Sequence, residues 1–198
     1  MRLAPLAVAA LAIFAGYKLY SRREISHAPG VLASANPEQR DIESAAVIER
    51  GEFRLRPRAK FSATVRVLRR EDYSMGPLAK LIPTDFAVGW GPMSDSAVLA
   101  DVEISQGGRF YYWRTEHWPI KREDIETHSA NWHVIPENST VSDLLGRLRA
   151  GSVVELRGQL VDIEGGDGGM RTSLTRGDTG AGACEILLAE SVRIAEER

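Results

Sequence analysis

An uncharged apolar run near the N-terminus is the feature that most limits how this chain can fold. Leu3–Tyr17 holds 15 residues without a charge and is followed by Lys18, Arg22 and Arg23. A helix of this length measures about 22 Å at ~1.5 Å per residue. It reaches 18 residues at Tyr20 if Lys18 extends its amine to the lipid headgroups. Residues 1–23 are therefore set apart from the fold of the remaining chain.

The run has three interpretations: an uncleaved transmembrane anchor, a cleaved signal peptide, and a buried helix. Arg2 and the apolar stretch suit a signal peptide, but no small-x-small cleavage site follows. Aromatic and basic residues border the run instead, as they do at the end of an anchored helix. We expect a single-pass anchor in the cell membrane that contacts lipid through residues 3–20.

The orientation of this anchor rests on two opposing arguments. Lys18, Arg22 and Arg23 outnumber Arg2, which by the positive-inside rule holds the body in the cytoplasm. Single N-terminal anchors of this length mostly deliver the body across the membrane. We expect the body on the periplasmic side.

Composition excludes several classes of protein. Residues 1–24 hold four basic residues and one acid, which leaves 21 basic and 26 acidic residues and a net charge of −5. This balance argues against a dedicated nucleic-acid binder. Cys184 is the single cysteine, so an intrachain disulfide and a zinc site of several thiolates are excluded. The chain has no phosphate-binding loop, no dinucleotide fingerprint and no Gly-x-Ser-x-Gly, so we expect no cofactor and no metal.

The remainder divides into a tether and one globular domain. Residues 24–36 contain Pro29, Gly30 and Asn36 and show no periodicity, which is typical of a tether. Residues 37–198 suit a single globular domain. A helix is predicted from Asn36 to Gly51, because Asn36 is a good N-cap and Pro37 suits the first helical position.

The other expected elements follow from alternation, turns and caps. A strand is predicted at 53–70, a short helix near 94–99 within an irregular stretch 71–100, and a hairpin at 102–113. A second irregular stretch holds residues 118–136. A helix at 141–149, a strand at 152–163 and last strands at 171–175 and 184–194 complete the set. The fold class is α+β with a mainly antiparallel sheet, as a small OB-like, partly open barrel with one or two flanking helices, preceded by a transmembrane helix.

Aromatic residues gather in the middle of the chain. Trp90, Trp113, Trp118 and Trp132 all fall between residues 86 and 132, beside glycine- and proline-rich loops. They either pack a small β core or line a groove that stacks on a ligand.

Two further groups of residues could carry chemistry. His128 and His133 could share a metal, one of them could act as a base oriented by Asn131, or they could be structural. Cys184 could be a nucleophile with His133 or His128 as base and Asp178 as orienting carboxylate, or a buried inert thiol. Arg176 and Asp178 could brace the glycine loop between them.

The strand at 54–70 carries a run of cations: Arg54, Arg56, Arg58, Lys60, Arg66, Arg69 and Arg70. The run is either a solvated strand face or a contact for anionic lipid or a polyanion.

Three strings resemble a known group of proteins. They are DFAVGWGPMSD (85–95), HSANWHVIP (128–136) and SLTRGDTGAGACE (173–185). Together they resemble an uncharacterised group of bacterial membrane-anchored proteins over about residues 55–190. The resemblance implies a bacterial source and no particular activity.

We therefore expect a membrane-anchored binding or assembly module of the bacterial envelope, with an envelope protein or a small ligand as partner and no role for nucleic acid. Its expected surface is Trp90, Arg109, His128, Asn131, His133, Arg176 and Asp178. One alternative is a hydrolase or transferase that uses Cys184 with His133 and Asp178. The other is contact with anionic lipid or a polyanion through the strand 54–70.

Overall fold

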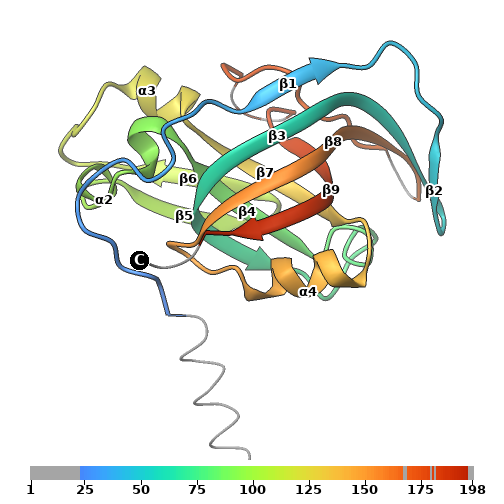
Figure 1. Ribbon diagram of the computed structural model, residues 1–198, viewed down its shortest axis with the longest axis horizontal. Helices are drawn as coiled ribbons and strands as arrows, with labels where there is room; N and C mark the ends of the chain where they lie inside the picture. The colour runs from blue at the N-terminus through green and yellow to red at the C-terminus, as the bar shows by residue number, and fades with distance from the viewer. Residues whose placement is uncertain (1–22, 167–168, 179, 181, 196–198) are drawn as a thin grey trace, which may run out of the picture.

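The computed structural model describes residues 23–166, 169–178, 180 and 182–195 and shows a mainly β chain with short helices (Figure 1). The strands are β1 (Glu38–Asp41), β2 (Ile48–Arg50), β3 (Phe53–Asp72), β4 (Thr84–Gly89), β5 (Glu103–Gly107), β6 (Phe110–Arg114), β7 (Ser129–Pro136), β8 (Val153–Gly165) and β9 (Glu185–Ile194). The helices are η1 (Gly91–Ser94), α2 (Ser96–Leu99), α3 (Arg122–Thr127) and α4 (Ser139–Arg147).

The membrane anchor expected at residues 1–23 lies, except for Arg23, outside the described residues. Within the described part of the chain, no helix has the length and the apolar character needed to cross a bilayer.

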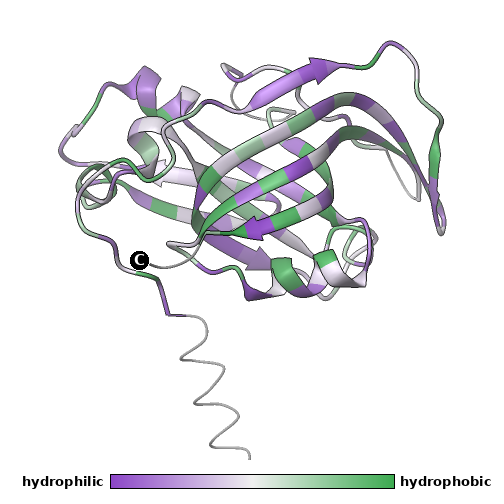
Figure 2. Cartoon of the chain, viewed as in Figure 1, coloured by the Kyte–Doolittle hydropathy of each residue, from purple (hydrophilic) through white to green (hydrophobic). Residues whose placement is uncertain are grey.

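The long strand β3 organises the main sheet. The order is β1-β3-β4-β7-β9-β8, β2 also pairs with β3, and a further β3–β8 pairing closes a ring of hydrogen bonds. Strands β7 and β9 are parallel, and the other pairs are antiparallel. Strands β5 and β6 form a separate hairpin. Hydrophilic and hydrophobic residues alternate along β3 and β8, as two-sided strands require (Figure 2).

The mainly antiparallel sheet and the few flanking helices agree with the sequence-based expectation in its coarse form. The OB-like barrel does not, because the structure is a seven-stranded mixed sheet. Two features account for the difference. The last strand β9 joins β7 in parallel, and β1 and β2 add two short strands to β3.

The prediction of a helix from Asn36 to Gly51 is wrong. This stretch forms β1 and β2, and each pairs with β3. Its expected apolar stripe is weak, since Ala45 and Ala46 are exposed. Pairing with β3 therefore overrides the local capping signal. The predicted strand at 171–175 is also absent.

Two strands were missed. Strands β4 and β7 fall in stretches expected to be irregular, and both are buried on their two faces. Ser129, Asn131 and His133 alternate with apolar residues along β7, so the period of a strand was present. The other predicted strands, the hairpin, the short helix near 94–99 and the helix α4 are confirmed within a few residues.

Two large apolar clusters cover the two faces of the sheet. The first includes Phe61, Phe86 and Trp132, and α4 adds Leu145. Phe61 and Trp132 meet edge to face, with ring centroids 5.4 Å apart. The second includes residues of β3, β7, β8 and β9 together with Ile82. A third, smaller cluster around Met93 and Ile125 lies under the hairpin β5–β6.

The segment expected to be a tether lies against the body. The amide of Ile25 donates to the carbonyl of Ala150 at 2.9 Å, and Nε2 of His27 is 2.7 Å from the carbonyl oxygen of Gly151. The amide of Ala33 donates to Oγ of Ser94 at 3.0 Å. Residues 25–33 therefore follow the surface of the domain as a strap.

We predict that Gly158→Ala destabilises the fold, because β8 and β9 approach closely at a bulge. A Cβ at Gly158 would lie 1.9 Å from the carbonyl oxygen of Leu188. The free energy of unfolding should fall by at least about 2 kcal/mol in urea titrations. Gly146→Ala in α4 is the control, because its Cβ meets nothing within 4 Å. It should stabilise by about 0.5–1 kcal/mol, and equal effects of the two changes would contradict the prediction.

Candidate functional site

A polar cluster lies on the outer face of strands β4 and β7. Their register sets Asp85 opposite His133 and Ala87 opposite Asn131. Side chains directly opposite, and those two residues apart on one strand, share a face of the sheet. The fold therefore brings Asp85, Asn131 and His133 together, and all three are buried.

The hairpin β5–β6 covers this cluster with the residues of its turn. Arg109, at φ 73°, is the one non-glycine residue with positive φ among those described. Its guanidinium donates to Oδ1 of Asp85 at 2.9 Å and to the carbonyl of Ile82 at 3.0 Å. The same group stacks 3.7 Å from the ring centroid of Tyr73, and the Arg109 amide donates to the Tyr73 hydroxyl. Gly108 and Arg109 both have positive φ, as the two central residues of a primed hairpin turn require, so the turn itself sets the position of Arg109.

His133 lies between a carboxylate and a thiol. Its Nδ1 is 2.9 Å from Oδ1 of Asp85, in an ion-pair contact that lacks the direction of a well-formed hydrogen bond. On the same face of β7, Asn131 contacts the Cys184 thiol. Burial lowers the pKa of His133, but the contacts and charges of Asp85 and Cys184 outweigh burial and raise the pKa to about 9.

Cys184 stands directly before β9 and is partly exposed. Because Glu185 pairs with Trp132 in the parallel register, Cys184 reaches the level of Asn131. Nδ2 of Asn131 is 3.9 Å from Sγ of Cys184 and donates to the Arg109 carbonyl at 3.2 Å. Oδ1 of Asn131 accepts from Nε2 of Gln106 at 2.7 Å.

Several buried polar atoms of this cluster have no hydrogen-bond partner among the described residues: Oδ2 of Asp85, Oε1 of Gln106 and Nδ1 of His133. Buried polar atoms are nearly always paired, so each such atom calls for an explanation. Their concentration around one histidine and one thiol is what a reactive centre would show.

Tyr73 and Tyr111 border the same cluster. Burial and the charge of Asp85 raise the pKa of Tyr73 to about 12, so its hydroxyl stays protonated at neutral pH. The Tyr111 hydroxyl is 3.0 Å from Oγ of Ser129, which donates to the carbonyl of Ile125 at 2.6 Å. Both tyrosines therefore border the cluster as uncharged side chains.

Four of the seven expected surface residues lie apart from this cluster, and Trp90 and His128 are the first two. Trp90 is 2% exposed and packs in the core, and Trp132 is fully buried, so neither ring is free to stack on a ligand. Nδ1 of His128 is 2.9 Å from the carbonyl oxygen of Asp124. The His128 carbonyl accepts from the amide of Trp90 at 3.0 Å. His128 therefore joins α3 to η1.

Arg176 and Asp178 brace the loop before β9, but through separate partners. Arg176 pairs with Glu185 and with Oε1 of Gln39, and its guanidinium lies 5.3 Å from the Phe61 ring centroid. Asp178 accepts from Oγ of Ser173 at 2.7 Å. The carboxylate beside His133 is therefore Asp85 and not Asp178.

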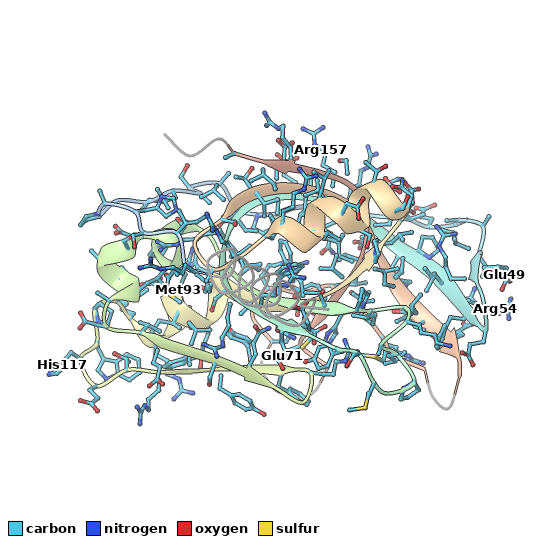
Figure 3. The ribbon with its side chains drawn as sticks, turned by 90° about the horizontal axis from the view of Figure 1, so that it is seen from below. Glu49, Arg54, Glu71, Met93, His117 and Arg157 are labelled. Atoms are coloured by element: carbon cyan, nitrogen blue, oxygen red, sulfur yellow. The ribbon has the colours of Figure 1, made fainter. Side chains whose placement is uncertain are left out.

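The cations at the start of β3 are paired with acids. Arg54, Arg56, Arg58 and Lys60 each lie within 3.8 Å of a carboxylate from β2, β8 or β9. Arg54 and Glu49 lie together at the outer end of this sheet (Figure 3). Arg66 is buried and donates to Oγ of Ser96 at 2.8 Å. Much of the basic run is therefore compensated within the protein.

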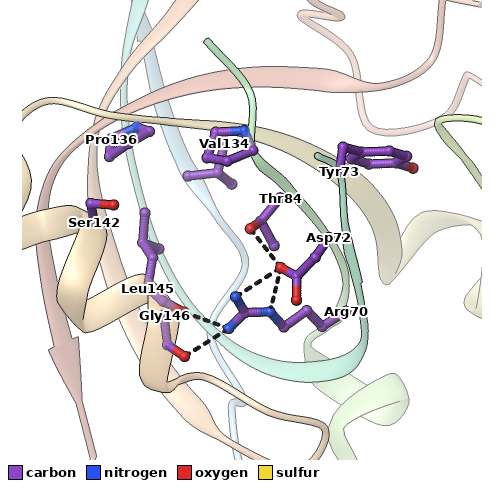
Figure 4. A pocket seen from close by; sticks show the side chains of 10 residues that line it. Arg70, Asp72, Tyr73, Thr84, Val134, Pro136, Ser142, Leu145 and Gly146 are labelled. Atoms are coloured by element: carbon purple, nitrogen blue, oxygen red, sulfur yellow. Dashed lines mark hydrogen bonds and ion pairs between the residues drawn. The ribbon is translucent and has the colours of Figure 1, made fainter. Parts of the chain in front are cut away.

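A pocket of 280 Å³ opens where β3 and β4 meet α4 (Figure 4). Arg70 donates there to the carbonyls of Leu145 and Gly146 and to Oδ1 of Asp72, which also accepts from Thr84. These contacts fasten the C-terminal turn of α4 to β3. The pocket shares Tyr73 with the polar cluster and otherwise lies on a different set of residues.

Within the described ranges, no three histidine, cysteine, aspartate or glutamate side chains are grouped to hold a metal ion. No family model, no curated protein and no solved structure matches this chain. Its chemistry is therefore argued from the polar cluster itself.

Sequence reasoning found Cys184, His133, Asn131 and Arg109 but missed Asp85, Gln106, Tyr73 and Tyr111. Asp85 had a local signal, since it is the single charged residue in the stretch 81–94. A charge in a strand buried on both faces needs a partner. The other three residues join the cluster through the hairpin and a loop, which local patterns do not reveal.

We predict that the stability of the fold falls as pH rises from 6.5 to above 9. The folded-state pKa of His133, about 9, exceeds the unfolded value near 6.5, so the folded protein binds the extra proton over this interval. The stabilisation is complete below about pH 6.5 and is lost as pH passes about 9. Urea unfolding at a series of pH values measures it.

Asp85→Asn should flatten this pH dependence, because it removes the carboxylate beside Nδ1 of His133. Asp143→Asn, at an exposed position of α4, is the matched control and should retain the wild-type slope. A wild-type slope in Asp85→Asn would refute the assignment to His133.

Proposed function

We propose that this protein is a thiol-dependent hydrolase or transferase in which Cys184 is the nucleophile, His133 the base and Asp85 the orienting carboxylate. The supporting observation is that Oδ1 of Asp85 lies 2.9 Å from Nδ1 of His133, and that Asn131, two residues earlier on the same face of β7, has its Nδ2 3.9 Å from Sγ of Cys184. Nucleophilic catalysis generally requires a nucleophile, a base that takes its proton and a third group that orients the base.

The surroundings of His133 also support the proposal. Arg109 and His133 both contact Oδ1 of Asp85, so the carboxylate is held in place beside the imidazole. Cys184 is also partly exposed, as a nucleophile must be to meet its substrate.

The chemical steps follow from these positions. In its neutral form, His133 takes the proton of the Cys184 thiol, and the sulfur attacks the carbonyl carbon of an acyl substrate. The bond to the leaving group then breaks, and the imidazolium returns its proton to that group. Water, or another acceptor deprotonated by His133, attacks the thioester and releases the thiol.

We also propose, on the sequence alone, that residues 3–20 hold this domain at the bacterial cell membrane, with the body on the periplasmic side. The apolar run without a cleavage site and its border of tyrosine, lysine and arginine support this location.

A binding or assembly role is the second candidate, and one observation favours it. Phe110 and Tyr112 on the outer face of β6 are 40% and 57% exposed, and Trp118 is 57% exposed. Exposed aromatic rings are enriched where proteins meet partners. We propose an envelope protein as the partner of this surface. A double variant with Tyr112→Ser and Trp118→Ser should no longer bind this envelope protein. The reactivity of Cys184 should stay unchanged.

For the thiol chemistry, we predict that His133→Gln slows alkylation of Cys184 by iodoacetamide at pH 7 at least tenfold, because the thiol loses its base. Intact-mass spectrometry follows the single modification, since Cys184 is the only cysteine. His117→Gln, at an exposed histidine in the loop after β6, is the control and should react at the wild-type rate. Wild-type alkylation in a folded His133→Gln protein would disprove the proposed dyad.

A further inference from the structure

Neighbouring groups fix the orientation of the Asn131 side chain. It lies on β7 two residues before His133, on the same face, and is 2% exposed. The carbonyl of Arg109 only accepts hydrogen bonds, so the atom 3.2 Å from it is Nδ2. Oδ1 then faces Gln106, whose Nε2 donates to it at 2.7 Å. The amide therefore presents its nitrogen, and not its oxygen, to Cys184.

The position of this nitrogen suits one chemical task. One N–H of Asn131 is engaged by Arg109, and Nδ2 lies 3.9 Å from Sγ of Cys184. When a sulfur attacks a carbonyl carbon, the oxygen becomes an oxyanion roughly 3 Å from the nucleophile. An atom can lie about 3 Å from both Sγ and Nδ2 when these are 3.9 Å apart. A second N–H of Asn131 can therefore meet the oxygen at the point where its charge develops.

We infer that Asn131 is the oxyanion donor of this centre and that the substrate is a carbonyl compound, an ester, thioester or amide. The inference rests on the proposed function and adds to it the group that stabilises the tetrahedral oxyanion, which forms only with a carbonyl substrate. Sulfur forms a bond to the carbonyl carbon, the carbonyl electron pair moves to oxygen, and Asn131 donates to that oxygen. Collapse of the oxyanion expels the leaving group, which takes the proton of His133.

Gln106 is a positioning residue in this scheme. Its amide donates to Oδ1 of Asn131. Gln106→Glu replaces that donor by an acceptor of the same shape, which removes one of the two hydrogen bonds that orient the Asn131 amide. Gln106 is partly exposed on the hairpin, so the fold should tolerate this change.

The test compares two reactions of the same sulfur. p-Nitrophenyl acetate acylates through an oxyanion, whereas iodoacetamide alkylates a saturated carbon without one. Asn131→Ala should lower the acylation rate about 100-fold or more and change the alkylation rate less than about threefold. Gln106→Glu should lower acylation about tenfold with unchanged alkylation. The burst of p-nitrophenolate and intact mass measure the two rates, and far-ultraviolet circular dichroism verifies folding.

The outcomes separate this inference from the proposed function. Equal loss of acylation and alkylation in both variants, or loss of neither, overturns the oxyanion role while leaving Cys184 and His133 as the reactive pair. A wild-type protein that is alkylated rapidly but never acylated overturns the acyl substrate class. Alkylation that does not depend on His133 overturns the dyad and, with it, the role of Asn131.

Discussion

The double pairing of β3 is the constraint on which the rest of the structure depends. Its 20 residues pair first with β8 and then with β4, so one strand closes the ring of hydrogen bonds. This closure fixes β4 beside β7 and thereby sets Asp85 opposite His133. A slip of one residue would turn both side chains to the apolar face around Phe86 and Trp132. The apolar core therefore enforces the register of the polar cluster.

The polar cluster is costly to bury and is held by few groups. Arg109 and His133 share Oδ1 of Asp85, while Oδ2 has no protein partner among the described residues. Replacing such a group by well-packed apolar residues is often neutral or stabilising, so stability alone gives little reason to keep it. The chemistry proposed for Cys184 would give the chain a reason to keep this cluster that stability does not.

The sequence predicts those elements whose pattern is local. Three elements could be predicted because residues near in sequence stabilise each of them. They are the alternating strand β3, the glycine turn between β5 and β6, and the capped helix α4. Strands β4 and β7 are covered on both faces by distant segments, so polar residues such as Asn131 lie where an exposed loop was expected. Cys184 and His133 were identified from residue chemistry, whereas Asp85 depends on a register between strands more than 40 residues apart. The predicted helix at 36–51 failed for the same reason, since long-range pairing with β3 decided its form.

The strap at residues 25–33 has a consequence for reach. A free segment of this length could extend about 30 Å and let the domain swing. Hydrogen bonds to Ala150, Gly151 and Ser94 remove that freedom. If residues 3–20 lie in the bilayer as proposed, the strap shortens the segment that links the domain to the anchor. The chemistry proposed for Cys184 would then be confined to molecules close to the membrane.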